Sequence, residues 1–263
     1  PSLLGDLPTS EPIQVLHVDD EAGLGELVKD YLESLDDDFQ VHLESDAKSA
    51  YNRFNAEESR FDCIVSDYQM PGMDGLELLK AIRRDHPSFP FVLFTGKGSE
   101  EIAADAISAG VTEYLQKKMG TDQYDVLANR VKNVVEGYRA ERQYRRLVQA
   151  MEWTREGIGL INEDEQFVFV NHAFADLLGY DREELVGEDW GLLYPDGEAN
   201  ILRDDILPLI SRTGRWVSEM SFVKRDGEQV QIDHALANID DNMLVSLIRP
   251  IEGRERRSGG PPR

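Results

Sequence analysis

The sequence has 263 residues, and its 28 Lys plus Arg against 51 Asp plus Glu give a formal net charge of −23. With 41% hydrophobic residues, a chain of this length can bury the cores of one or two domains, which excludes wholesale disorder. The negative charge would repel phosphate backbones, so direct nucleic-acid binding is not expected without a local basic surface.

The single cysteine, Cys63, can form neither an internal disulfide nor a cysteine-based zinc site. No stretch approaches the roughly 18 apolar residues of a membrane helix, and the N-terminal stretch is acidic where a signal peptide would be basic. We therefore expect a cytoplasmic protein with no membrane association. The acidic excess, together with 8 Lys against 20 Arg, is typical of proteins from salt-accumulating cells, so we hypothesise a halophilic source.

Five short apolar runs alternate with amphipathic stretches between residues 12 and 121, which predicts a doubly wound parallel α/β sheet. The runs are Ile13–Val18, Phe39–Leu43, Phe61–Val65, Phe89–Phe94 and Val111–Leu115. The second run is the most polar, so we expect it at an edge of the sheet. The ligand site of such a sheet lies beyond the carboxyl ends of its strands, and functional residues are therefore sought just after each run.

Residues 122–152 contain no proline, and apolar side chains recur there at helical spacing as far as Leu147 and Val148. One interpretation is that the last helix of the first domain continues as a signalling helix, which could also form a dimer. The alternative is a last domain helix followed by a solvated linker, since the apolar positions thin out around Glu141–Arg146.

Residues 153–250 predict a second domain of the α+β class with an antiparallel sheet. Short strands are expected at Gly157–Ile161 and Gln166–Val170, and three long ones at Arg215–Lys224, Glu228–Ile239 and Met243–Pro250. Asp226-Gly227 predicts a hairpin turn between two of the long strands. Small helices are expected at 173–186, and a longer helix at Ile201–Ser211. The composition of residues 251–263 is typical of a disordered tail.

Carboxylates follow the first and third runs of the first domain, at Asp19, Asp20 and Asp67. Parallel strands bring their carboxyl ends to one edge, so these acids would repel one another unless a hard cation such as Mg²⁺ lay among them. The fourth run ends at Thr95 and the fifth runs into Lys117. Carboxylates, Mg²⁺, a hydroxyl and an ammonium predict a phosphoryl-transfer site with a carboxylate acceptor.

The Asp19-Asp20 pair, the SDYQMPGMDG stretch, the FTG stretch and Tyr114-Leu115-Gln116-Lys117 resemble the receiver domain of two-component response regulators. The resemblance implies a flavodoxin-like sheet of order 2-1-3-4-5. It implies that Asp67 is the phosphoacceptor, that Asp19, Asp20, Asp67 and the Gln69 backbone carbonyl hold Mg²⁺, and that Thr95 and Lys117 contact the phosphoryl oxygens. It also implies that Thr95 and Tyr114 form the conformational switch.

Two positions depart from or vary within that family pattern. Lys118 stands where receivers usually have a proline with a cis bond, so the cis or trans state of the Lys117–Lys118 bond is left open. Gln69 could orient a water that hydrolyses the acyl phosphate. His17 and Cys63 lie within apolar runs and are interpreted as structural.

The stretch from Glu156 to Gly187, with Asn171 and Phe174, and the later FVKRDGEQVQID segment resemble a PAS domain. The PAS ligand is unknown. The domain lacks the cysteine that flavin-thiol photochemistry needs, and its long helix lacks the histidine that usually binds haem, so neither cofactor is expected. His172 and His234 are interpreted as ordinary polar or partly buried residues, and Trp190, Tyr194 and Trp216 as core.

The leading interpretation is a phosphorelay protein that is not itself an enzyme. A sensor histidine kinase phosphorylates its receiver, and the changed receiver surface relays the state to the PAS domain. The alternatives are a PAS-ligand sensor or scaffold, and a fragment of a longer hybrid histidine kinase or transcription regulator. The downstream partner is unidentified, and a homodimer through residues 122–152 or the PAS domain remains open.

Overall fold

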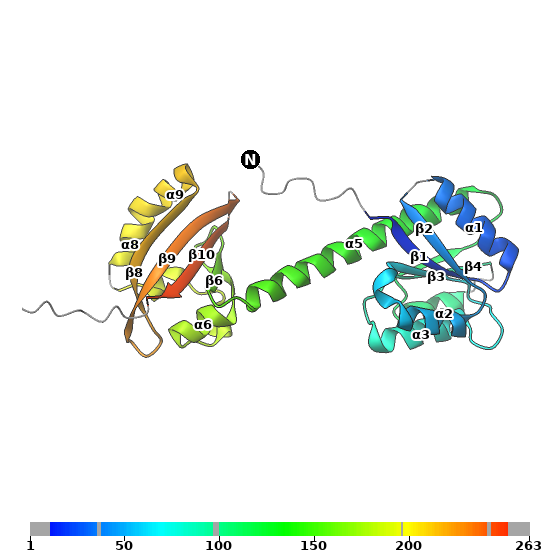
Figure 1. The fold of residues 1–263 in the computed structure, drawn as a ribbon, viewed down its shortest axis with the longest axis horizontal. Helices are drawn as coiled ribbons and strands as arrows, with labels where there is room; N and C mark the ends of the chain where they lie inside the picture. The colour runs from blue at the N-terminus through cyan, green and yellow to red at the C-terminus, as the bar shows by residue number, and fades with distance from the viewer. Residues whose placement is uncertain (1–10, 36–37, 97–99, 196, 241–242, 252–263) are drawn as a thin grey trace, which may run out of the picture. The chain divides into compact units, whose positions relative to one another are not determined.

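The computed structural model describes residues 11–35, 38–96, 100–195, 197–240 and 243–251. Its contacts divide the chain into two compact units, Pro1–Tyr144 and Arg145–Arg263 (Figure 1). The predicted tail lies outside the described residues except for Ile251. Within the described ranges, no helix is both long enough and apolar enough to cross a membrane.

Unit 1 is built on a five-stranded parallel sheet, as the sequence predicted. Its strand order is β2-β1-β3-β4-β5, which places the more polar β2 at an edge. The strands are β1 (Ile13–Val18), β2 (Phe39–Glu44), β3 (Cys63–Ser66), β4 (Phe91–Thr95) and β5 (Glu113–Gln116). Since β1, β3 and β4 are buried on both faces, their sequences are almost continuously apolar.

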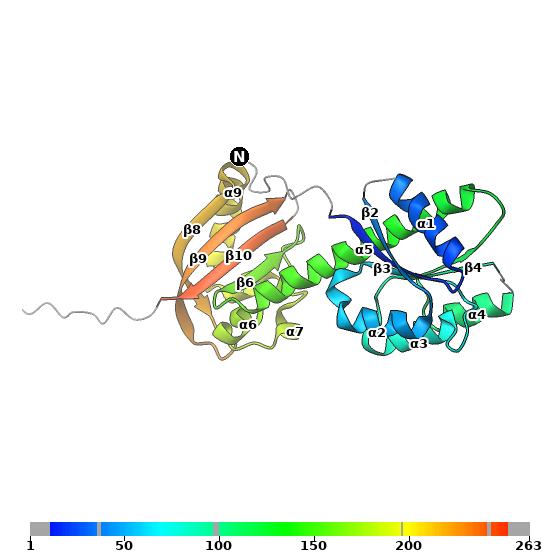
Figure 2. The ribbon, with the colours of Figure 1, turned by 45° about the vertical axis from the view of Figure 1, so that its right-hand side comes forward.

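Helices cover both faces of this sheet (Figure 2). The helices α1 (Ala22–Leu35) and α5 (Asp122–Glu152) bury Val28, Leu32 and Leu127 in one core. The second core, on the other face, includes Phe54 and Leu79. It belongs to α2 (Ala47–Ala56), α3 (Gly75–Asp85) and α4 (Glu100–Ser108), with a short 3₁₀ turn, η1, at Glu58–Arg60.

Three strands of unit 1 begin two residues later than their apolar runs predicted. Phe61 and Phe89 are buried but precede the paired residues, because apolar content reports burial rather than pairing in the sheet. Pro90, directly before β4, has no N–H to donate to a neighbouring strand. The N–H of Val111 bonds to the Ala106 carbonyl, which closes the end of α4 instead of extending β5.

Helix α5 continues unbroken from Asp122 to Glu152, so the interpretation of a shorter domain helix followed by a linker is wrong. Its first half packs on unit 1, where Arg139 holds Asp62 through Nε (3.0 Å) and Nη2 (2.6 Å). Tyr144 and Leu147 are exposed farther along the helix. The division between the units falls inside α5, between residues 144 and 145.

Unit 2 contains the predicted antiparallel sheet, with strand order β7-β6-β10-β9-β8. The strands are β6 (Gly157–Ile161), β7 (Phe167–Val170), β8 (Arg215–Val223), β9 (Gln229–Asp240) and β10 (Met243–Pro250). Gly227 has φ 86° in the turn between β8 and β9. The N–H of Lys224 bonds to the Glu228 carbonyl there (2.8 Å), which confirms the hairpin predicted at Asp226-Gly227.

One core joins the helices of unit 2 to alternate strand residues such as Phe222, Ile232 and Ile248. The helical segments are α6 (His172–Leu178), α7 (Arg182–Leu185), η2 (Trp190–Leu193), α8 (Glu198–Ile201), η3 (Leu202–Ile206) and α9 (Leu207–Thr213). The helix predicted at Ile201–Ser211 is present within a continuous helical run, but it is not regular, since the π-helical segment η3 lies between α8 and α9. Pro208 lies in the first turn of α9, where its missing N–H interrupts the regular ladder.

Candidate functional site

Four of the predicted site residues meet at the carboxyl ends of the strands in unit 1. Asp19 follows β1, Asp67 follows β3, Thr95 ends β4 and Lys117 follows β5. The N–H of Asp67 bonds to the Val18 carbonyl (2.8 Å), which continues the pairing of β1 and β3 to the site. Asp19, Asp67 and Thr95 are buried, so parallel pairing has brought distant positions into one partly dehydrated cluster.

The Lys117 ammonium lies between two of these carboxylates. Its Nζ donates to Asp19 Oδ2 and to Asp67 Oδ1, each at 2.7 Å. It also lies 5.6 Å from the centre of the Phe94 ring. Burial disfavours the charged ammonium, but the hydrogen bonds to Asp19 and Asp67 outweigh that effect and raise the pKa of Lys117. The lysine is therefore a charged counter-ion for the acidic cluster.

Backbone donors fix the remaining oxygens of the same two carboxylates. Asp19 Oδ1 accepts the N–H of Glu21 (2.9 Å), and Asp67 Oδ2 accepts the N–H of Gln69 (2.6 Å). Each buried carboxylate therefore has one charged partner and one backbone partner, as buried charge requires.

A cavity of about 460 Å³ opens onto these groups. Asp20 and Gln69 are exposed at its wall. The lining residues are Asp19, Asp20, Glu21, Leu24, Asp67, Gln69, Thr95, Gly96 and Lys117. Glu21 was missed as a site residue from sequence, although its position directly after the acidic pair was a signal for it.

The chemistry of this cavity fits a hard divalent cation. Asp19, Asp20 and Asp67 line the cavity with three carboxylates, two of which contact the Lys117 ammonium, and carboxylate oxygens are the ligands that Mg²⁺ prefers. Among the residues that the structure describes, no three His, Cys, Asp or Glu side chains are grouped closely enough to hold a metal ion. Two of the carboxylates contact Lys117 instead.

Tyr114, the predicted switch residue, is partly buried against the core of α2, α3 and α4. Its hydroxyl is buried with no hydrogen-bond partner among the described residues. Thr95 is 1% exposed at the end of the neighbouring strand, and Leu93 pairs with Tyr114 in the sheet. Burying a hydroxyl without a partner is costly, so this position of Tyr114 is not fully stabilised.

The loop after Lys117 differs from the expected proline geometry. Lys118 is exposed, and its N–H donates to Gln123 Oε1 (2.7 Å). The Lys117–Lys118 bond is trans, since no cis peptide bond occurs in the described ranges. The trans bond still leaves the Lys117 ammonium in contact with Asp67.

Gly75 brings the start of α3 against the backbone of Asp67. A Cβ added at Gly75 would lie 2.1 Å from the Asp67 carbonyl oxygen. Asp74 caps this helix by accepting the Glu77 N–H (2.7 Å), and Glu77 accepts the Asp74 N–H in return. The MPGMDG stretch therefore gives a tight turn and a capped helix start directly behind the candidate acceptor.

His17 and Cys63 are buried in the sheet, in agreement with their structural interpretation. His17 Nδ1 lies 3.0 Å from the Val65 carbonyl oxygen, so this nitrogen carries the proton. Burial lowers the pKa of His17 and raises the pKa of the Cys63 thiol, and both side chains are therefore neutral.

In unit 2, His234 is fully buried among aromatic side chains. Its ring nitrogens lie 3.3 Å from the Tyr194 hydroxyl and 3.0 Å from the Ser246 hydroxyl. Burial lowers the pKa of His234 to about 3. Trp190 and Tyr194 are buried in the core as predicted, and Trp216 packs against it.

Comparisons with known proteins assign a family to each unit. Residues 15–129 match the family model of the response regulator receiver domain, and residues 155–248 match that of a PAS domain. The chain therefore contains a receiver domain followed by a PAS domain. The receiver part is homologous to response regulators.

Among the relatives, the transcriptional regulatory protein FixJ of Bradyrhizobium diazoefficiens is 33% identical over 106 residues, which cover 40% of this chain and 50% of FixJ. The nitrogen assimilation regulatory protein NtrX of Azorhizobium caulinodans is 33% identical over 137 residues, 51% of this chain and 29% of NtrX. This chain thus spans half or less of the length of these relatives. A solved receiver domain from Clostridium thermocellum is 24% identical, with a TM-score of 0.45, covering 49% of this chain and 98% of that one.

Proposed function

We propose that this receiver–PAS chain is a response regulator in a phosphorelay, with Asp67 as the phosphoacceptor and a sensor histidine kinase as the donor. The observation that carries the proposal is the Asp67 carboxylate, which lies between the Lys117 ammonium and the Gln69 N–H at the wall of an acidic cavity. The homology of residues 15–129 to receiver domains supports it.

The chemistry follows from the charges around Asp67. A carboxylate oxygen of Asp67 forms a bond to phosphorus while the bond from phosphorus to the donor imidazole breaks, and the released imidazole takes up a proton from solvent. Lys117 offsets the negative charge that arrives on the acceptor, and the Thr95 hydroxyl offers a hydrogen bond to the phosphoryl oxygens. In this proposal Asp19, Asp20, Asp67 and the Gln69 carbonyl hold Mg²⁺, which supplies further positive charge when it is bound.

Phosphorylation would change the environment of Lys117, Thr95 and Tyr114. A phosphoryl group adds up to two negative charges and strong acceptor oxygens, which would draw Thr95 toward position 67 and give the Lys117 ammonium, already bonded to Asp67, a new partner. Support for the switch comes from Tyr114, whose buried hydroxyl has no partner within the described residues. A changed surface around α4 and β5 would follow, and α5 leads from unit 1 into unit 2.

The proposal places the protein in the cytoplasm, where the donor kinase presents its phosphohistidine. It assigns no kinase activity to the chain. A homodimer is part of the proposal, supported by the exposed apolar side chains Tyr144 and Leu147 on α5. The PAS unit would then act as an interaction or sensing module.

Incubation with labelled acetyl phosphate and Mg²⁺ tests the acceptor. We expect acid-stable, base-labile label in the wild type and none above background in Asp67→Ala. Asp85→Ala, which removes an exposed carboxylate at the end of α3, is the matched control and should label like the wild type. Equal labelling of Asp67→Ala would refute the assigned acceptor, and loss of label on chelation with EDTA is expected if Mg²⁺ is required.

A further inference from the structure

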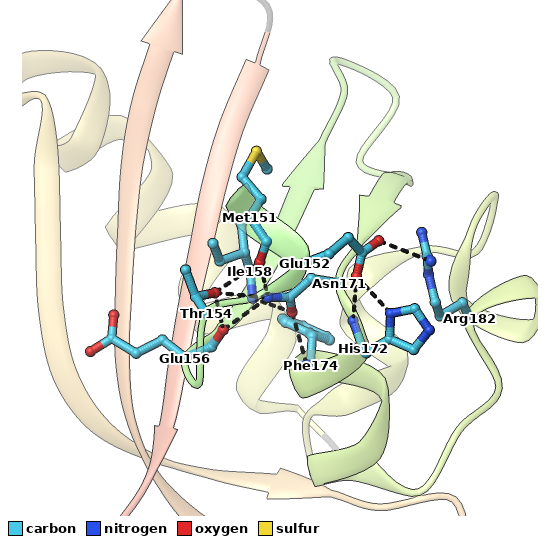
Figure 3. Close-up of polar contacts among 9 residues, drawn as sticks. All are labelled: Met151, Glu152, Thr154, Glu156, Ile158, Asn171, His172, Phe174 and Arg182. Atoms are coloured by element: carbon cyan, nitrogen blue, oxygen red, sulfur yellow. Dashed lines mark hydrogen bonds and ion pairs between the residues drawn. The ribbon is translucent and has the colours of Figure 1, made fainter. Parts of the chain in front are cut away.

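The end of α5 is fastened to the fold of unit 2 by two polar contacts of different character. One is centred on the buried side chain of Asn171, and the other on the carboxylate of Glu152, the last residue of α5 (Figure 3). Both join α5 to the start of α6, far from the phosphoacceptor in the sequence. Neither contact is used by the chemistry proposed for unit 1.

Asn171 forms the permanent part of this joint. Its Oδ1 accepts the N–H of Ile158 and the N–H of Phe174, each at 2.9 Å, which sets the start of β6 and caps α6. Its Nδ2 donates to the Met151 carbonyl (2.9 Å) in the last turn of α5, to Thr154 Oγ1 (3.1 Å) and to the Glu156 carbonyl (3.0 Å). One fully buried amide therefore connects three elements, and breaking it would leave several buried groups unpaired.

Glu152 forms a second contact at the surface. Its Oε2 accepts both the backbone N–H (3.0 Å) and Nδ1 (2.7 Å) of His172, and its Oε1 lies 2.9 Å from Arg182 Nη1. The His172 side chain is 67% exposed and that of Arg182 is 33% exposed. Arg182 also lies over the Phe169 ring of β7, 5.7 Å from its centre, so the contact reaches α6, α7 and β7.

These two contacts differ in how easily they open. An ion pair that is partly exposed, as this one is with Glu152 18% exposed, shifts an opening equilibrium by roughly two- to five-fold, whereas the buried amide of Asn171 opens only with the surrounding fold. A contact of this modest size can be broken by a change in α5 without unfolding unit 2. The stretch of α5 before it, including Tyr144 and Leu147, is exposed, so the polar contacts that hold α5 to α6 lie at this last turn.

We propose that the Glu152–His172–Arg182 contact is a releasable latch, hinged on Asn171, through which the state of the receiver controls the last turn of α5 on the PAS unit. The regulatory part of this proposal rests on the phosphoacceptor function proposed above. The existence of the latch does not, because it concerns contacts within unit 2.

The test is amide hydrogen exchange of the full chain, followed at Gln149–Thr154. Glu152→Gln keeps the size of the side chain and removes its charge, and His172→Ala removes the Nδ1 donor. We expect each variant to exchange roughly two- to five-fold faster than the wild type at this turn, with unchanged exchange in β9. Glu183→Gln, an exposed charge change on α7 beside Arg182, is the matched control and should exchange like the wild type. Wild-type exchange in Glu152→Gln would overturn the latch.

The same measurement with acetyl phosphate and Mg²⁺ tests the regulation, with label on Asp67 quantified in parallel. We expect labelled wild type to exchange faster at this turn, and Glu152→Gln to label normally but to show no further change. Label without any change in exchange would overturn the latch as a relay while leaving the phosphoacceptor intact. Absence of label in the wild type would overturn both the phosphoacceptor and the relay.

Discussion

At the scale of single residues, Lys117 decides the electrostatics of the candidate site. Asp19 and Asp67 are buried, and each places one oxygen on the lysine ammonium. The lysine is thus the counter-ion of the cluster, and in our proposal it is also the group that meets an incoming phosphoryl group. The raised pKa of Lys117 keeps it charged for both roles.

Lys117→Met should destabilise unit 1 by roughly 1–3 kcal/mol, because it leaves two buried carboxylates without their cation. The contribution of Lys117 is fully present below the ordinary lysine pKa of about 10.4 and is lost as pH rises through the raised folded value. Urea unfolding followed by circular dichroism measures the loss, and Mg²⁺ should restore part of it. Lys118→Met, at an exposed position, is the control. Equal stability of the two variants would contradict the counter-ion role.

His234→Gln should weaken the acid sensitivity of unit 2. Since burial lowers the pKa of His234 to about 3, the unfolded state binds the extra proton between about pH 6.5 and 3, so stability falls as pH falls across that window. The wild type should lose up to about 1.4 kcal/mol per pH unit there relative to His234→Gln.

Tryptophan fluorescence measures this effect selectively, because Trp153, Trp190 and Trp216 all lie in unit 2. His86→Gln, in unit 1, should keep the wild-type pH dependence of this signal. Parallel pH profiles for the wild type and His234→Gln would show that the buried imidazole has no such effect.

At the scale of elements, the start of α3 positions the candidate acceptor. Gly75 lets the first turn of the helix approach the Asp67 carbonyl more closely than any side chain allows. The same helix buries Leu78, Leu79 and Ile82 against the sheet. Helix α3 therefore links the position of Asp67, in the loop after β3, to the packing of its own apolar side chains in the core.

Gly75→Ala should destabilise unit 1 by roughly 1–3 kcal/mol through steric overlap and should lower the labelling of Asp67. Gly23→Ala is a matched control, because a Cβ at that helical position meets nothing within 4 Å. It should be neutral or stabilise α1 by about 0.5–1 kcal/mol. Thermal unfolding of the two variants checks the difference, and equal midpoints would show that α3 can shift to accept the methyl group.

The predicted bounds of strands were correct where the buried apolar residues are also the residues that pair in the sheet. The runs that became β1 and β10 begin and end as predicted, whereas Phe61 and Phe89 are buried outside the paired part of the sheet. The interruption at Leu202–Ile206 escaped prediction because apolar spacing continues through it, although Pro208 was a visible signal. The continuity of α5 through its polar stretch could not be decided by apolar spacing, which does not measure helix propensity.

At the scale of the whole molecule, acidic groups greatly outnumber basic ones, with a net charge of −23. Such self-repulsion destabilises a compact chain, and salt screens it within about 3 Å at 1 M. The described ion pairs, such as Arg53–Glu44 at 2.8 Å, each join one acid to one base and therefore leave the net charge of −23 unchanged. A salt-accumulating source remains our proposal for this composition.

We expect the unfolding midpoints of both units to rise between about 0.1 M and 1 M KCl, because screening weakens the repulsion between carboxylates. Calorimetry across this range measures the effect. Sucrose at matched osmolality is the control for exclusion effects that do not involve charge. Full folding and unchanged midpoints in dilute buffer would count against the halophilic proposal.

The sequence by itself determined the two domain types and the parallel and antiparallel sheets, because apolar runs and turn residues are local patterns. It also predicted the acids, hydroxyl and lysine that line the cavity, because each stands at the end of an apolar run. Only the tertiary structure decided that Lys117 bridges Asp19 and Asp67, that Tyr114 buries a hydroxyl with no partner among the described residues, and that Asn171 and Glu152 hold the end of α5. Some of these features are hydrogen bonds between residues far apart in the sequence, from 13 positions for Asn171 and Ile158 to 98 positions for Lys117 and Asp19. The buried hydroxyl of Tyr114 depends instead on how the surrounding residues enclose that side chain. Local spacing carries no information about either, because both arise from packing.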